Sequence, residues 1–198
     1  MSHTNKPEPI SSLFRRNIPN LLTLANMLLG LIVLYLSIGN GGQDYAVLSC
    51  ILIVIAAVVD AFDGTIARLL GAESDFGKQL DSFADLTTFG LAPFAVLLTL
   101  EPIRATPTLL PVLALHPLAG AFRLARFNLG NYTDYFVGLP ITAAGSIQAC
   151  FGLVLSRFNF LSRWVLGSAT LLTIALSLLM VSSFKITKHK RGRRANHQ

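Results

Sequence analysis

Long apolar segments alternate with short polar ones along most of the chain. Six of the apolar segments approach the length of about 20 residues that an α-helix needs to cross a membrane. They lie near residues 21–38, 45–70, 76–100, 108–127, 139–156 and 164–184. The pattern predicts an all-α, polytopic membrane protein with six transmembrane helices in a single domain of 198 residues.

The two ends of the chain are polar. Residues 1–8 read as a disordered tail, and residues 186–198 form a basic tail that we expect to be cytoplasmic. Residues 9–19 mix apolar side chains with Arg15 and Arg16, which predicts a short helix in the membrane interface. An ordinary basic flank of the first span is the alternative for that segment.

Composition and charge support a membrane protein. The hydrophobic fraction is 53%, the charged fraction 13% and the mean hydropathy +0.59, which is more apolar than a soluble domain of this size. With six spans and a cytoplasmic N-terminus, all 16 basic residues except Arg104, Arg157 and Arg163 face the cytoplasm. The net charge of +6 therefore indicates topology and contact with anionic lipid, not nucleic-acid binding. No removable signal peptide is recognisable, which fits a prokaryotic plasma membrane.

Six of the ten acidic residues fall between positions 60 and 85, and four aspartates there lie in or beside apolar segments. Carboxylates in membrane helices normally face an internal cavity and bind something positive. Asp60 and Asp63 share a helix face, as do Gly77, Asp81 and Asp85. In an antiparallel hairpin the four carboxylates converge near the cytoplasmic surface, with Asp60 and Asp85 deepest.

Four carboxylates so close together cannot all stay ionised without cations. Two divalent ions would balance them, and an all-oxygen ligand set favours Mg²⁺ or Mn²⁺ over zinc. Two such ions can clamp a phosphate centre. Structural ion pairs with Arg68 and Lys78 are one alternative, although two bases cannot neutralise four acids. A cation or proton transporter that uses the aspartates as a relay is the other.

The acidic residues also belong to a longer motif. Its fixed positions are Asp60, Asp63, Gly64, Ala67, Arg68, Gly77, Asp81 and Asp85. Residue types and spacing resemble, at every position, the signature of the CDP-alcohol phosphotransferases. These are six-helix membrane enzymes that move a phosphatidyl or similar group from a CDP-linked donor to an alcohol. The resemblance implies a two-metal site on Asp60, Asp63, Asp81 and Asp85, with Asp85 as general base. It also implies CDP binding by Gly64, Ala67, Arg68 and Gly77, and a homodimer.

The start of the first span carries a second, shorter motif. Pro19-Asn20 followed by Thr23 is similar to the Pro-Asn-x-x-Thr sequence of the same family, which implies that Asn20 and Thr23 face the CDP group. A simple helix cap is the alternative role for Asn20.

The acceptor is indicated by a third segment. The sequence FRLARFN at residues 122–128, followed by Gly138-Leu139-Pro140, resembles the membrane-embedded phosphatidylserine synthases. The resemblance implies CDP-diacylglycerol and L-serine as substrates, with Arg123, Arg126 and Asn128 binding serine or phosphate. Glycerol 3-phosphate or an inositol phosphate is the alternative acceptor. The two arginines also suit the interface as positive-inside residues.

His116 precedes a proline in an apolar run of the fourth span. We expect it to be a hydrogen-bonded core residue and not a catalytic one.

Overall fold

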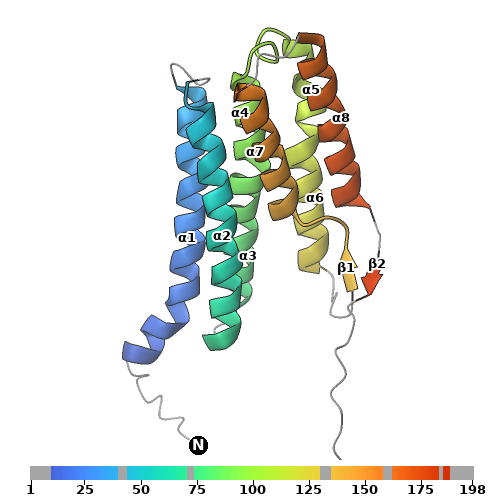
Figure 1. The fold of residues 1–198 in the computed structure, drawn as a ribbon. Helices are drawn as coiled ribbons and strands as arrows, with labels where there is room; N and C mark the ends of the chain where they lie inside the picture. The colour runs from blue at the N-terminus through green and yellow to red at the C-terminus, as the bar shows by residue number, and fades with distance from the viewer. Residues whose placement is uncertain are drawn as a thin grey trace, which may run out of the picture.

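The computed structural model describes residues 10–39, 44–70, 74–129, 135–157, 162–182 and 185–187, and these are almost entirely helical. The helices run along a common direction (Figure 1). The first half contains α1 (Ile10–Ile38), α2 (Ala46–Leu70), α3 (Asp75–Asp85), the π-helix η1 (Leu86–Leu91) and α4 (Ala92–Thr99). The second half contains the 3₁₀ turn η2 (Pro107–Leu109), α5 (Leu110–Leu113), α6 (Leu115–Leu129), α7 (Ile141–Arg157) and α8 (Ser162–Val181).

Each apolar segment of the sequence is helical, which confirms the helical fold class. Four helical stretches of the described residues are long and apolar enough to cross a membrane: Ile18–Ile38, Asp75–Thr99, Pro107–Leu129 and Ser162–Val181. The apolar part of α2, Ala46–Phe62, and α7 lie at the other two predicted spans, and six membrane crossings stay a prediction. The third predicted span is the continuous series α3, η1 and α4, so its single α-helix was an incomplete prediction.

The N-terminal segment differs in form from the prediction. α1 is one helix from Ile10 onward with Pro19 inside it, so residues 10–19 begin the first long helix and are not a separate element. Its location in the membrane interface stays a prediction. The tail at residues 1–8 lies outside the described residues.

Within the described ranges, a short pair of strands departs from the predicted all-α structure. β1 (Tyr135–Val137) pairs antiparallel with β2 (Lys185–Thr187). Three residues are too few for an alternating pattern to be recognised in a sequence. The expected basic tail at residues 186–198 therefore begins inside β2, and residues 188–198 lie outside the described part.

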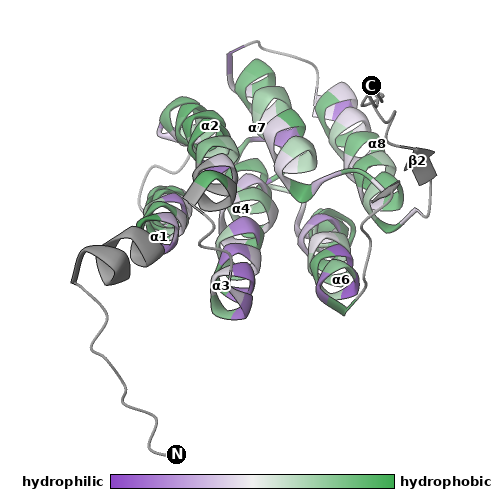
Figure 2. Ribbon diagram, turned by 90° about the horizontal axis from the view of Figure 1, so that it is seen from below, coloured by the Kyte–Doolittle hydropathy of each residue, from purple (hydrophilic) through white to green (hydrophobic). Residues whose placement is uncertain are grey.

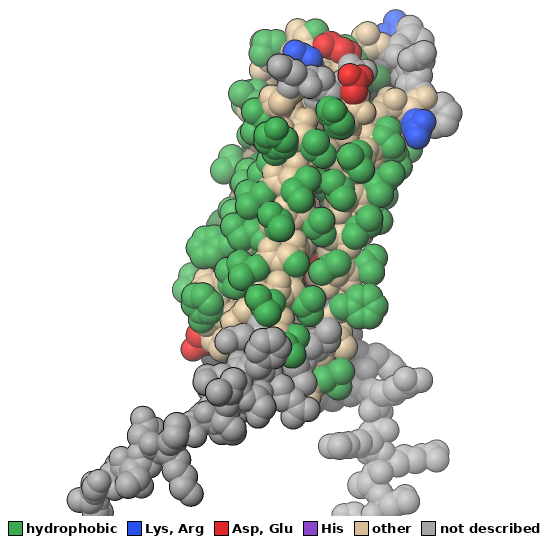
Figure 3. Space-filling model, turned by 90° about the vertical axis from the view of Figure 1, so that its left-hand side faces the viewer, with side chains coloured by type: hydrophobic (Ala, Val, Ile, Leu, Met, Phe, Trp, Pro, Cys, Tyr) green, Lys and Arg blue, Asp and Glu red, His purple; other side chains and the backbone are tan. Residues whose placement is uncertain are grey.

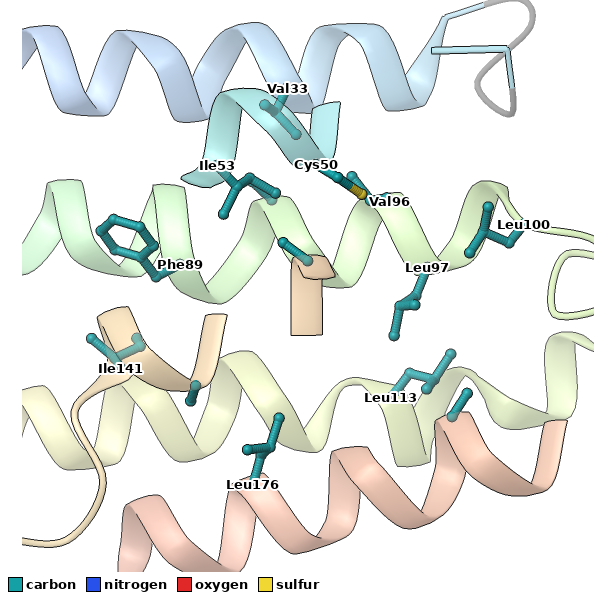
Figure 4. Packing of buried hydrophobic residues seen from close by; sticks show 14 of the residues in the cluster. Val33, Cys50, Ile53, Phe89, Val96, Leu97, Leu100, Leu113, Ile141 and Leu176 are labelled. Atoms are coloured by element: carbon teal, nitrogen blue, oxygen red, sulfur yellow. The ribbon is translucent and has the colours of Figure 1, made fainter. Parts of the chain in front are cut away.

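The interior of the bundle is apolar. Val33 of α1, Ile53 of α2 and Phe89 of η1 are fully buried and belong to one apolar cluster with Ile141 of α7 (Figure 4). The outward faces of α1 and α2 are apolar as well, and hydrophobic side chains cover most of that side of the molecule (Figure 3). An apolar surface of this extent is unfavourable in water and suits the hydrocarbon interior of a membrane.

The predicted antiparallel hairpin of α2 and α3 is present. α2 ends at Leu70, and α3 begins at Asp75 after Ser74, whose Oγ accepts a hydrogen bond from Gly77 N over 3.0 Å. Serine at this position satisfies one of the free amides of the first helical turn. Viewed along the bundle from this end, hydrophilic residues gather on α3 and α6 (Figure 2). The polar end of the bundle is therefore built around the hairpin.

Candidate active site

Three of the four predicted aspartates meet between α2 and α3. Asp60 comes from α2, and Asp81 and Asp85 come from successive turns of α3. One carboxylate oxygen from each lies within 4.8 Å of the others. All three side chains are half-buried. The spacing of three and four residues along the two helices produces this convergence, as the sequence predicted.

The cluster fits a divalent cation. Its donors are hard carboxylate oxygens, which Mg²⁺ and Mn²⁺ prefer. Asp85 Oδ1 is buried and has no hydrogen-bond partner among the described residues. A buried carboxylate oxygen without a partner is costly, and a bound cation would compensate it. The described residues therefore supply three ligands for the divalent metal chemistry expected of this motif.

The other signature residues of α2 come after Asp60 in the sequence. Asp63, Gly64, Ala67 and Arg68 lie in the last two turns of α2, and their side chains are outside the described part of the chain. Their helical positions agree with the predicted hairpin. The assignment of Asp63 to metal, and of the other three to CDP, stays a prediction.

Asn26 of α1 supports the cluster and was missed by the sequence analysis. It is fully buried, and its Nδ2 donates to Asp60 Oδ1 over 3.4 Å. The backbone carbonyl of Asn26 accepts a hydrogen bond from Thr88 Oγ1 over 3.0 Å. The sequence could have indicated Asn26, because Thr23, Asn26 and Gly30 share one face of an otherwise apolar helix. Asn26 thus ties α1 to the aspartate of α2 and to the helix that carries Asp85.

The predicted CDP-binding residues of α1 lie beside the start of α3. A Cβ placed on Gly77 would lie 3.0 Å from Asn20 Oδ1, so glycine permits this close approach. Thr23 is buried, and its Oγ1 donates to Pro19 O over 3.1 Å. Asn20 and Gly77 are therefore brought together as neighbours, whereas Thr23 has a bond within its own helix. Their contact with nucleotide stays a prediction.

The two arginines of the FRLARFN segment face different surroundings. Arg123 lies within electrostatic range of Asp85, and its Nε is buried without a hydrogen-bond partner among the described residues. Arg126 donates from Nη1 to Val181 O over 3.0 Å and from Nη2 to Ser182 O over 3.3 Å. These carbonyls belong to the end of α8, where a helix leaves its last acceptors unsatisfied. Arg123 faces the carboxylates, and Arg126 caps α8.

Gly138 and Leu139, which follow the FRLARFN segment in the sequence, contact the C-terminal end of α8. Gly138 has a φ of +70°, and a Cβ there would lie 2.7 Å from Met180 O. Leu139 N donates to Leu179 O over 3.0 Å. Glycine is required because this backbone conformation is unfavourable for other residues and because α8 approaches so closely. The Gly138-Leu139 segment therefore fixes the entrance of α7 against α8.

Asn128 joins α6 to α3. Its Nδ2 donates to Ser82 Oγ over 2.9 Å and to Gln79 Oε1 over 3.3 Å. Lys78 lies over the ring of Phe127 at 5.5 Å from its centroid, which adds a cation–π contact between the same helices. Asn128 thus holds the helix that carries Arg123 beside the helix that carries Asp81 and Asp85.

Residues 16–182 match the CDP-alcohol phosphatidyltransferase family, which is most of the chain and includes every residue of the acidic motif. The chain belongs to this family. The carboxylate cluster of Asp60, Asp81 and Asp85 lies within the matched residues.

Individual members of the CDP-alcohol phosphatidyltransferase family are similar over nearly the same length. The chain is 32% identical over 186 residues to a CDP-diacylglycerol–serine O-phosphatidyltransferase of Helicobacter pylori, covering 92% of this chain and 76% of that one. It is 33% identical over 177 residues to the enzyme of that name in Bacillus subtilis, covering 88% and 92%. An archaetidylserine synthase of Methanothermobacter thermautotrophicus is 34% identical over 171 residues, covering 85% and 68%.

Proposed function

We propose that this protein is an integral-membrane CDP-diacylglycerol–serine O-phosphatidyltransferase. It transfers the phosphatidyl group of CDP-diacylglycerol to the hydroxyl of L-serine and releases CMP. The observation that carries this proposal is the meeting of Asp60, Asp81 and Asp85 at one point, with Arg123 beside them. Relatives whose names specify transfer to serine, or synthesis of a serine lipid, support serine as the acceptor.

The proposed membrane arrangement has six crossings. Of the two remaining helices, α2 (Ala46–Leu70) has 25 residues, which is long enough to cross, and α7 (Ile141–Arg157) has 17, which at a rise of about 1.5 Å per residue is near the lower limit. The excess of basic residues at one end of the predicted topology supports cytoplasmic termini and a cytoplasmic active site. A prokaryotic plasma membrane is part of the same proposal. The acyl chains of the donor can then stay in the bilayer while its CDP headgroup reaches the carboxylates. A homodimer belongs to the same proposal.

Asp85 is the proposed general base. An aliphatic hydroxyl is a weak nucleophile until its proton is removed. Asp85 accepts that proton as the serine oxygen forms a bond to the β-phosphorus of CDP-diacylglycerol. The bond from that phosphorus to the bridging oxygen breaks, and CMP leaves with the oxygen. Two divalent cations held by Asp60, Asp63, Asp81 and Asp85, when bound, supply positive charge for the phosphate oxygens and the leaving group.

Arg123 is the proposed binding residue for the serine carboxylate. A guanidinium can pair with a carboxylate through two parallel hydrogen bonds. Arg123 lies beside Asp85 and has a buried Nε without a partner in the described part of the chain. Arg126 and Asn128, which bond to α8 and α3, support the position of α6. Asn20, Thr23, Gly64, Ala67, Arg68 and Gly77 form the proposed CDP-binding region.

The acceptor is tested by comparing substrates. Purified protein in vesicles with CDP-diacylglycerol and Mg²⁺ or Mn²⁺ is expected to release CMP when labelled serine is added and to form labelled phosphatidylserine. Chelation with EDTA should stop the reaction, and added Mg²⁺ or Mn²⁺ should restore it, because the carboxylates need cations. CMP release with glycerol 3-phosphate or an inositol phosphate, and none with serine, would contradict the acceptor assignment.

The two arginines should respond differently to substitution. Arg123→Gln is expected to raise the KM for serine roughly 10- to 100-fold, because a charged hydrogen-bond partner of the carboxylate is lost. Arg126→Gln should lower the thermal unfolding temperature in detergent and leave the KM for serine nearly unchanged, because it bonds to carbonyls of α8. Steady-state kinetics and thermal unfolding of both variants check this. A higher KM in Arg126→Gln alone would reverse the assignment.

A further inference from the structure

The helix that carries Asp85 changes its form immediately after that residue. Residues Leu86–Leu91 form the π-helix η1, in which the amide of Ala92 donates to Thr87 O, five residues back. Single π-turns inside α-helices are uncommon and occur frequently at functional sites. The direction in which Asp85 points is therefore coupled to the geometry of η1.

Pro93 gives a physical reason for η1. In a regular α-helix, the carbonyl of Phe89 would accept a hydrogen bond from the amide of residue 93, but proline has no amide hydrogen. The ring of a proline also clashes with the carbonyl four residues earlier, which opens the helix locally. A wider π-turn relieves the clash, and Phe89 O, to which Pro93 cannot donate, is open to a donor from another helix.

His116 of α6 supplies this donor. Its Nε2 lies 2.9 Å from Phe89 O, and the ring is fully buried. A carbonyl oxygen can only accept, so the hydrogen is on Nε2. The sequence-based prediction of a hydrogen-bonded core histidine is thereby confirmed. The bond fixes the π-turn from the side of α6.

Three further contacts hold η1 in the same position. Thr88 is fully buried, and its Oγ1 donates to Asn26 O of α1 over 3.0 Å. On the same side, a Cβ on Gly30 would lie 2.8 Å from Thr88 Cα. On the α7 side, a Cβ on Gly145 would overlap Phe89 O. Three helices thus approach η1 so closely that its backbone has little freedom to move.

We propose that His116 and Thr88 are positioning residues for the reaction. By satisfying the carbonyl that Pro93 frees and by anchoring η1 to α1, they hold Asp85 at the distance from Asp60 and Asp81 at which the three carboxylates bind metal together. Neither side chain contacts the substrate. The role in the reaction rests on the proposed function, but the effect on metal binding does not.

Two matched pairs of variants test this proposal. His116→Gln places an amide nitrogen at the position of Nε2, whereas His116→Asn has a nitrogen only at the position of Nδ1 and cannot reach Phe89 O. Thr88→Val removes the hydroxyl without changing shape, and Thr173→Val makes the same change at an equally buried threonine of α8. α8 packs mainly against α5, α6 and α7. His116→Gln is therefore the control for His116→Asn, and Thr173→Val is the control for Thr88→Val.

Three measurements distinguish positioning from mere stability. In the metal-free protein, hydrogen–deuterium exchange of the peptide containing Asp85–Leu91 should be faster in His116→Asn and Thr88→Val than in the controls. The Mn²⁺-induced increase in unfolding temperature should be smaller in the same two variants. Their kcat should fall roughly 10- to 100-fold while the KM for serine changes little, as for other residues that orient metal ligands.

The proposal is overturned if Thr88→Val behaves like Thr173→Val in the exchange and Mn²⁺ measurements. It is also overturned if His116→Asn and His116→Gln are indistinguishable in them. If His116→Asn does not fold, Thr88→Val alone tests the proposal, because valine keeps the shape of threonine. Exchange and Mn²⁺ binding are measured without an acceptor, so a wrong acceptor assignment would leave these results intact.

Discussion

Replacing Asp85 by asparagine is expected to lower the rate of CMP release roughly 10²- to 10⁴-fold, the range in which general bases contribute. The amide has nearly the same shape, but it cannot accept the hydroxyl proton and adds no negative charge to the cluster. CMP release in vesicles and the Mn²⁺-induced shift of the unfolding temperature measure the two consequences.

Asp75→Asn is the matched control for this substitution. Asp75 is an exposed carboxylate in the first turn of the same helix. Its loss removes only a favourable charge at a helix N-terminus, about 0.3–1 kcal/mol of stability. Activity should stay close to that of the unaltered protein. An equal loss of activity in both variants would mean that the charge of the helix, and not the position of Asp85, determines the rate.

The Asp85→Asn variant also distinguishes an enzyme from a transporter. A relay of aspartates for cations or protons would give ion flux across vesicles with no nucleotide product. CMP release that depends on serine and disappears in Asp85→Asn, with the protein still folded, would exclude that alternative. Ion flux without CMP release in the unaltered protein would instead support the transporter.

The convergence of the aspartates was predictable because it depends on local geometry. Residues three or four apart share a helix face, and an antiparallel hairpin opposes two such faces. Asp60, Asp81 and Asp85 therefore could be placed together from spacing alone. The long apolar segments likewise indicated the positions of the helices, although Leu139 and Pro140, at the start of the fifth predicted span, precede α7 and are not part of it.

Other features depend on contacts between helices, which the spacing of residues along the sequence does not reveal. The π-turn η1 follows from Pro93 together with a donor from α6, and the sequence alone does not show which helix lies beside Phe89. Arg123 and Arg126 are three residues apart and look equivalent on a helix. Their difference appears only when Asp85 is found on one side of α6 and the end of α8 on the other.

Substituting alanine for Gly145 is expected to cause a large loss of stability. The added Cβ would overlap Phe89 O and lie 2.7 Å from Phe89 Cα, so backbone has to move. Overpacking of a closely packed interior typically costs 1–3 kcal/mol, roughly, and backbone contacts relax less than side chains. The unfolding temperature in detergent, at a fixed heating rate, measures the loss.

Gly167→Ala is the control for that substitution, because a Cβ at this exposed position of α8 has no atom within 4 Å. Alanine favours helix by up to about 1 kcal/mol over glycine, so this variant should be as stable as the unaltered protein or slightly more stable. Equal stability of both variants would show that α7 can move away from η1 without cost. Since Gly145 and His116 act on the same carbonyl of Phe89, Gly145→Ala should also weaken the Mn²⁺-induced stabilisation, whereas Gly167→Ala should leave it unchanged.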